Sequence, residues 1–171
     1  MKIKLTPQLA YLIGLWRKVK SFDGVGVKGN EDIITVFSKE VMDLKLTTSD
    51  KLLSREDKVF FYHTSYRKFF QEVEKEQLDR FKYLNEYAAS YLAGLFDATG
   101  LIDEKGIVSI DWANNEDELL FLRLGFIAKK RGGKLIIDKP LLFLKFIKNY
   151  VKIKKLTNYL GENENGSEKR T

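Results

Sequence analysis

The sequence predicts an α+β fold built from two similar halves in one chain. An apolar helix pattern rich in small residues occurs twice, as LIGLWRKVK beginning at Leu12 and as LAGLFDATG beginning at Leu92. The copies lie about 80 residues apart, and a similar order of helices and strands follows each, which indicates an internal duplication. Small residues four apart in the second copy would let two helix backbones approach closely across a pseudo-twofold axis. The predicted helix interface consists of Gly14, Lys18, Gly94 and Ala98.

In the first half, apolar residues at helical spacing predict a helix over Leu9–Lys20. Thr6 is suited to cap its N-terminus and Pro7 to begin its first turn. Two short apolar runs around a Gly-Asn pair, Gly24–Val27 and Ile33–Phe37, predict a β-hairpin. The remaining elements predicted here are a helix over Ser38–Leu46, a strand over Lys58–Ser65 and a helix over Tyr66–Glu76.

The second half is predicted to start near Asn85 with a helix over Glu86–Thr99, which contains the second copy of the pattern. The elements expected after it are a strand over Gly106–Trp112, a helix over Glu116–Lys130, a strand over Lys134–Ile137 and a helix over Leu141–Lys155. The chain therefore divides into an N-terminal half (1–84), a C-terminal half (85–159) and a tail (160–171). The polar, glycine- and glutamate-rich composition of the tail predicts disorder.

Basic residues are unevenly distributed along the chain. The formal net charge is +6 and the sequence pI is about 9.3, which favours an anionic partner. Arg123–Lys155 contains eleven lysines and arginines but one acid, and Met1–Lys28 contains six and one. Such segregation predicts a basic face. The alternative is a charge-rich surface of the thermophile type, on which the segregation disappears when the chain folds.

The composition excludes several kinds of site. The chain has no cysteine, so it can form neither disulfides nor thiolate metal sites, and its one histidine, His63, excludes a histidine-based zinc site. No apolar run approaches the roughly 18 residues that a membrane span requires. The N-terminus lacks a signal-peptide pattern, so we expect a cytoplasmic protein without membrane association.

The segment LAGLFDATG resembles the signature helix of the LAGLIDADG homing endonucleases, with seven of nine letters identical, and LIGLWRKVK is similar to a degenerate first copy. The resemblance extends over most of the chain, up to about Lys155. It implies a single-chain member with two pseudo-symmetric αββαββα halves. The signature helices would form the interface between the halves, and two antiparallel sheets would lie in the major groove of DNA.

In active members of that family, the acid at the eighth letter of each copy binds divalent metal for cleavage of the DNA strands. The eighth letters here are Val19 and Thr99, and neither supplies a carboxylate. The nearby acid Asp97 is the sixth letter and points roughly 200° around the helix from that position. We therefore assign no catalytic residue, no metal site and no cofactor. Mg²⁺ would be needed only if other carboxylates made the protein an active endonuclease.

These observations favour a protein that binds double-stranded DNA without cleaving it, as a monomer whose two halves act as a pseudo-dimer. Two alternatives remain open at this point: an endonuclease that uses other carboxylates, and an RNA-binding splicing helper of the maturase type. Basic residues near the helix ends and the strands are the candidate nucleic-acid contacts. They are Lys18, Lys20, Lys28, Lys129, Lys130, Arg131, Lys134 and Lys139.

Overall fold

The computed structural model describes residues 2–156 and 159–160, so most of the predicted tail lies outside the described residues. The first half opens with α1 (Pro7–Lys18), which Thr6 caps by accepting a hydrogen bond from the Leu9 amide at 3.2 Å. The elements that follow are β1 (Val25–Lys28), α2 (Glu31–Asp43), the 3-10 turn η1 (Ser49–Lys51), β2 (Leu53–Arg55), β3 (Lys58–Phe61), α3 (Thr64–Lys75) and the short α4 (Gln77–Arg80).

The second half begins with α5 (Glu86–Thr99), which has the predicted bounds, and the Asn85 side chain caps its start by accepting a hydrogen bond from the Ala88 amide. The elements that follow are β4 (Gly100–Ile102), β5 (Val108–Asp111), α6 (Asn115–Arg123), β6 (Ala128–Arg131), β7 (Lys134–Ile137) and α7 (Pro140–Ile147). This half therefore has the αββαββα order that the resemblance implies.

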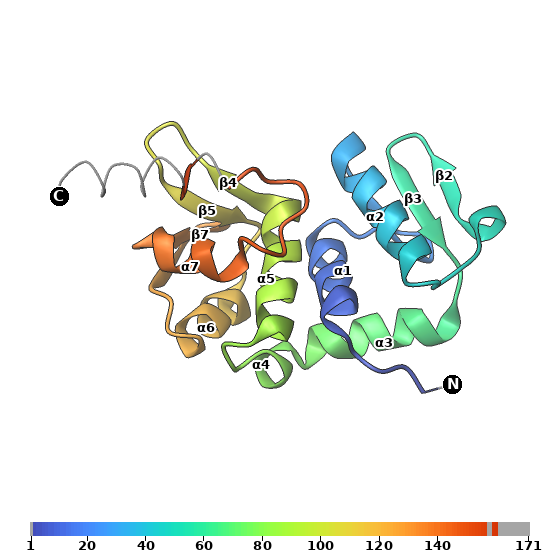
Figure 1. Ribbon diagram of the computed structural model, residues 1–171, viewed down its shortest axis with the longest axis horizontal. Helices are drawn as coiled ribbons and strands as arrows, with labels where there is room; N and C mark the ends of the chain where they lie inside the picture. The colour runs from blue at the N-terminus through green and yellow to red at the C-terminus, as the bar shows by residue number, and fades with distance from the viewer. Residues whose placement is uncertain (1, 157–158, 161–171) are drawn as a thin grey trace.

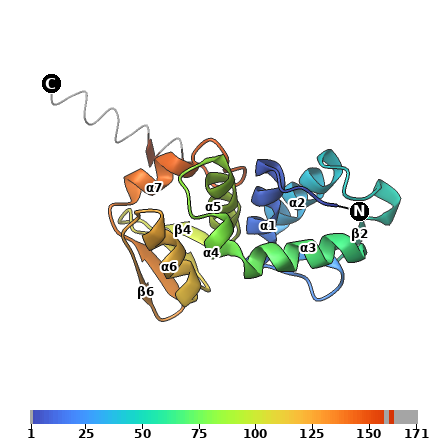
Figure 2. The ribbon, with the colours of Figure 1, turned by 90° about the horizontal axis from the view of Figure 1, so that it is seen from below.

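The two sheets are antiparallel and share one strand order. The first sheet is ordered β1-β3-β2 and the second β4-β5-β7-β6, so β1, β3 and β2 correspond to β5, β7 and β6. The first half differs at the position of β4, where only an isolated bridge joins Lys20 to Val27. Figure 1 shows the halves on either side of α1 and α5, which run side by side between them. In Figure 2, α3 and α4 connect the first half to the start of α5.

The predicted hairpin of Gly24–Val27 and Ile33–Phe37 is wrong, because its second segment lies inside α2. Asn30 does not occupy a hairpin turn. Its side chain accepts a hydrogen bond from the Ile33 amide at 3.0 Å and caps the helix. Ile33 and Phe37 then fall one helical turn apart on the buried face of α2.

The predicted helix over Glu116–Lys130 is also too long. It ends at Arg123 because Gly125 adopts a positive φ of 86°, and the residues from Ala128 form β6. The last helix stops at Ile147 and does not continue to Lys155. The sequence does not predict β4, because this strand begins directly after α5 and continues its apolar pattern.

Reciprocal glycines hold α1 and α5 together. A Cβ atom added to Gly14 would overlap the carbonyl group of Tyr91, and one added to Gly94 would overlap the carbonyl group of Tyr11. Each glycine meets the carbonyl group of the residue three positions before the other glycine, so the two helices cross at matching points of their sequences. The contact depends on the absence of a side chain at both glycines.

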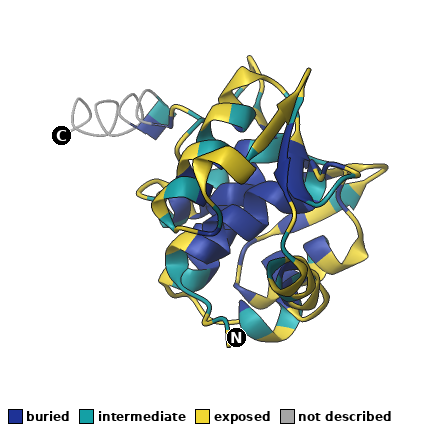
Figure 3. Ribbon diagram, turned by 90° about the vertical axis from the view of Figure 1, so that its right-hand side faces the viewer, coloured by how far each residue is buried: buried dark blue, intermediate teal, exposed yellow. Residues whose placement is uncertain are grey.

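The buried apolar side chains of the two halves form one continuous core around α1 and α5. Figure 3 shows the buried positions concentrated on these central helices, with exposed positions on the outer elements. No helix in the described part of the chain is long and apolar enough to span a bilayer.

Candidate nucleic-acid interface

Basic side chains line the solvent-facing side of the first sheet. Val27 and Val59 are paired and buried against the helices. Adjacent residues of a strand point to opposite faces, so Lys28, which follows Val27, and Lys58, which precedes Val59, face solvent. These paired positions, joined by their partner on β2, form the first-sheet row: Lys28, Lys58 and Arg55.

The second sheet carries a matching row at the corresponding positions. Ile110 and Leu135 are paired and buried, so their neighbours toward the ends of β5 and β7 face solvent. These neighbours and their partner on β6 form the second-sheet row: Asp111, Lys134 and Arg131. The duplication therefore places Arg55 opposite Lys58 in one sheet and Arg131 opposite Lys134 in the other.

The lysines of the rows are paired with acids, whereas the arginines are available to a partner. Lys58 lies 3.0 Å from Asp23, and Lys134 lies 3.7 Å from Asp111 in a solvent-exposed pair. Among the described residues, neither Arg55 nor Arg131 forms an ion pair, and both are exposed. An exposed guanidinium group that forms no ion pair can bind phosphate through two parallel hydrogen bonds.

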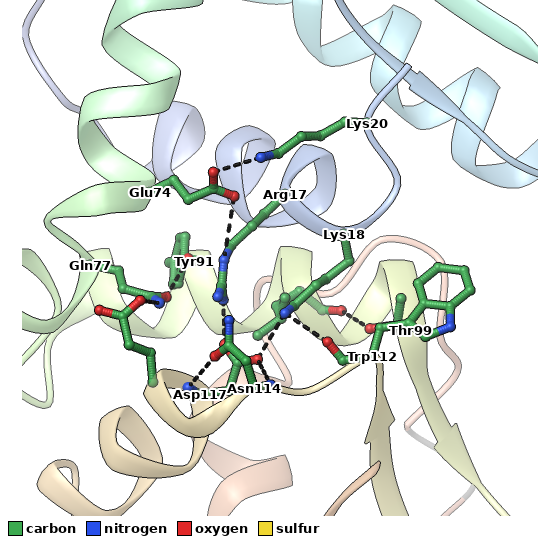
Figure 4. A network of polar contacts seen from close by, with 12 residues as sticks. Arg17, Lys18, Lys20, Glu74, Gln77, Tyr91, Thr99, Trp112, Asn114 and Asp117 are labelled. Atoms are coloured by element: carbon green, nitrogen blue, oxygen red, sulfur yellow. Dashed lines mark hydrogen bonds and ion pairs between the residues drawn. The ribbon is translucent and has the colours of Figure 1, made fainter. Parts of the chain in front are cut away.

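An ion-paired cluster occupies the end of α1, beside the first turn of α6 (Figure 4). Arg17 Nη1 donates to Asp117 Oδ1, and Lys18 Nζ donates to Asp117 Oδ2 at 2.8 Å. Arg17 and Lys18 belong to α1, whereas Asp117 lies in the first turn of α6. The cluster therefore ties the first half to the second across the helix interface.

The sequence around Asp117 fixes its carboxylate in this place. Asn114 and Asp117 form a capping box, in which the Asn114 side chain accepts from the Asp117 amide and Asp117 Oδ2 accepts from the Asn114 amide. Burial alone would raise the pKa of Asp117, but the Arg17 guanidinium and the Lys18 ammonium outweigh it, so this pKa lies below its usual value. Burial and the neighbouring Arg17 lower the pKa of Lys18.

Asp97, the acid of the second copy, is a buried structural group with 1% exposure. It accepts hydrogen bonds from the Tyr11 hydroxyl at 2.6 Å and from the backbone amides of Lys152 and Lys154 at 2.7 and 2.9 Å. Burial raises its pKa, and these hydrogen bonds offset part of the rise. Asp97 thereby fastens the segment after α7 to the helix interface.

The two eighth-letter residues end their helices without offering a carboxylate. Val19 is the C-cap of α1, and its carbonyl accepts a hydrogen bond from the Lys28 amide at 2.7 Å. Thr99 is half-buried at the end of α5, and its hydroxyl donates back to the Leu95 carbonyl at 3.3 Å. The helix ends, the reciprocal glycines and the paired antiparallel sheets together define the architecture.

Solved structures of the homing endonuclease I-DmoI share this architecture. One set of mesophilic variants superposes with a TM-score of 0.58 at 16% identity, over 84% of this chain and 96% of that one. I-DmoI in complex with DNA and Ca gives 0.60 at 15% identity, over 91% and 97%, and the complex with DNA and Mn gives 0.58 at 15%, over 82% and 96%. The chain has the LAGLIDADG homing endonuclease fold. No protein-family model matches the sequence, and no curated protein is a significant match.

The residues at the helix ends of this LAGLIDADG fold do not fit a divalent cation. Mg²⁺ is bound by oxygen ligands that normally include carboxylates. At the two positions where the resemblance implies metal ligands stand a valine and a threonine whose hydroxyl is bonded to its own helix, and the Lys18 ammonium lies close by (Figure 4). The described residues contain no group of three or more acids or histidines that could hold a metal.

The predicted nucleic-acid contacts separate into two groups within the fold. Lys28, Arg131 and Lys134 belong to the rows, and Lys129 is exposed on the same face of the second sheet, paired with Ile136. The other predicted residues do not belong to the rows. Lys18 binds Asp117 and the Trp112 carbonyl, and Lys20 binds Glu74 at 2.6 Å. Lys130 contacts the Gly132 carbonyl, and Lys139 is the N-cap of α7.

The sequence reasoning missed Arg55 and Lys58 of the first-sheet row. Their signal was present in the duplication, because Lys58 corresponds to the predicted Lys134 and Arg55 to the predicted Arg131. The correspondence could not be drawn while Ile33–Phe37 was assigned to a strand, because that assignment left β2 without a place. The predicted interface residues Lys18 and Ala98 lie beside the glycine crossing, at half-buried positions of this LAGLIDADG fold.

The two buried carboxyl groups should affect stability with opposite signs as the pH falls. The lowered pKa of Asp117 means that its contribution to stability is present above the usual pKa of 3.8 and is lost as the pH drops below it. The raised pKa of Asp97 means that its ionised form lowers the stability of the fold, so protonation of Asp97 as the pH falls increases stability. We expect the D117N variant to show a shallower loss of unfolding free energy below about pH 4 than the wild type. Urea unfolding from about pH 7 to about pH 3 measures this, and equal slopes would contradict it.

Proposed function

We propose that this protein binds duplex DNA through the solvent-facing rows of its two sheets and does not cleave it. The observation that carries the proposal is the repeated placement of exposed arginines, Arg55 and Arg131, at corresponding positions in two sheets. One chain thus presents the same cationic group on both sides of its helix interface. A DNA duplex offers phosphates on both sides of any bound segment, which suits two such rows.

The fold supports the choice of duplex DNA. I-DmoI has been solved in complex with its target DNA, and this chain covers nearly all of that protein's length with the same architecture. The sheet rows of this chain lie on the face that the helices leave uncovered. Basic residues on that face would contribute a sequence-independent, salt-dependent part of the affinity.

The chemistry of the helix ends supports binding without cleavage. Divalent metals serve phosphodiester cleavage by activating water and stabilising the leaving oxygen. Val19 and Thr99 supply no carboxylate for such a metal, and the cluster around Asp117 is saturated by Arg17 and Lys18.

Binding is tested by fluorescence anisotropy with randomised duplex DNA over a series of salt concentrations. We expect the paired variant R55A/R131A to bind roughly tenfold more weakly than the wild type, and its salt slope to fall by about two. The matched control K145A/K148A removes two exposed charges from α7 and its C-cap, on the helix side of the second sheet, and should leave both quantities unchanged. Equal affinity of the two paired variants would contradict the proposal.

Cleavage is tested on duplexes enriched by binding from the randomised pool, so that a preferred site is represented. With Mg²⁺ or Mn²⁺ added, we expect these duplexes to remain intact. Metal-dependent nicking would establish an endonuclease that uses other carboxylates. Tighter binding to structured RNA than to duplex DNA would favour the splicing-helper alternative.

A further inference from the structure

Trp112 is exposed in a backbone conformation that tryptophan rarely adopts. Its side chain is 65% exposed, and its φ of 58° lies in the left-handed region. Bulky residues in this region are outliers, and such strain persists only where the surrounding structure imposes it. Among the described residues, no aromatic or cationic side chain packs on the indole ring. The molecule therefore holds a large apolar surface in solvent at a conformational cost.

Two hydrogen bonds fix the backbone at Trp112 in this conformation. Lys18 Nζ donates to the Trp112 carbonyl at 2.8 Å, and the same ammonium group is held by Asp117. The next amide, of Ala113, donates to the Gly133 carbonyl at 2.9 Å. Lys18 stands at the seventh letter of the first copy, where the second copy has Ala98. A residue particular to the first half therefore fixes the backbone of Trp112 in the second half.

The indole lies where the second-sheet row meets the helix ends. Trp112 directly follows Asp111 of that row, and Figure 4 shows its ring directed away from the ion-paired cluster. The corresponding residue of the first half, after Lys28, is Gly29. The aromatic group is therefore present on one side of the helix interface only.

We propose that Trp112 stacks on a nucleobase at an opened base step in the central part of the bound DNA. Aromatic side chains stack on bases of any identity, and apolar wedges inserted between base pairs kink a duplex. An exposed indole on a backbone that hydrogen bonds fix at the helix ends suits both roles, because its position relative to the sheet row is set before DNA binds. The inference rests on the proposed DNA binding and adds the residue that contacts a base.

Tryptophan fluorescence provides a direct test, because the chain has only one other tryptophan, Trp16, which is 5% exposed. We expect wild-type emission to be quenched on addition of duplex DNA, and the W112F variant, which retains Trp16 alone, to lose that response. Stacking is worth about 5- to 150-fold in affinity, so W112G should bind DNA more weakly by a factor in this range. Glycine accepts the positive φ, so W112G should be at least as thermally stable as the wild type.

The matched control is Y83A, which removes an aromatic side chain of 66% exposure from the segment before α5, at the opposite end of that helix. Y83A should bind DNA as the wild type does. If the wild type shows no salt-dependent affinity for DNA, the proposed function itself is wrong. If the wild type binds but W112G binds equally well and the emission is unchanged, the stacking inference is wrong and DNA binding stands.

Discussion

Replacing Gly94 with alanine is expected to destabilise the protein by about 3 kcal/mol, which corresponds to a fall in Tm of about 6–12 °C. The added Cβ would overlap the Tyr11 carbonyl group and approach the Leu15 amide. Both obstacles are backbone atoms of a buried helix, so no side chain can rotate to make room. The helices must separate, which weakens packing along the whole interface. Thermal unfolding followed by circular dichroism measures the change.

The matched control for this variant is G133A. Gly133 is exposed, has no positive φ, and would place its new Cβ in open space. We expect its Tm to stay within about 1–2 °C of the wild type. A G94A variant as stable as G133A would show that the helix interface can relax, and would contradict the close packing described for Gly14 and Gly94.

Replacing Arg17 with methionine is expected to reduce the free energy of unfolding by about 3–5 kcal/mol. The Asp117 side chain is fully buried and would retain only Lys18 as a charged partner. Methionine fills much of the same volume, so the loss arises from the weaker compensation of the buried Asp117 charge and not from a cavity. Urea unfolding near neutral pH measures the difference.

Two further variants define the origin of that effect. K28M removes one member of an exposed pair, in which Lys28 lies 3.9 Å from Asp57, and should cost less than about 1 kcal/mol. The double variant R17M/D117L removes both buried charges and should recover part of the stability that R17M loses. If R17M behaves like K28M, the buried cluster does not stabilise the contact between the halves.

Local signals in the sequence were sufficient where one residue fixes an element boundary. Asn85 marks the start of α5, and Thr6 with Pro7 marks the start of α1, because caps and first-turn residues act within a few positions. The same kind of signal failed at Asn30, since a Gly-Asn pair suits both a hairpin turn and a helix cap. The helical spacing of Ile33, Phe37 and Val41 decides between these readings in the structure.

The candidate site was less predictable because its contacts join distant segments. Arg17 and Asp117 are 100 residues apart, and no local pattern links them. Lys18 was assigned both to the helix interface and to nucleic-acid contact, whereas the structure commits its ammonium group to Asp117 and Trp112. The eighth letters of the two copies are Val19 and Thr99, and identifying them needed only the alignment of the copies.

The shared position of α1 and α5 has a consequence for how the molecule unfolds. Each helix contributes buried side chains to the continuous core that both sheets cover. Melting either half would expose the apolar surface that it covers on the other, so we expect the two halves to unfold together. The chain is duplicated in sequence but cooperative in stability, and a fragment cut between α4 and α5 would leave each half without the helix that closes it.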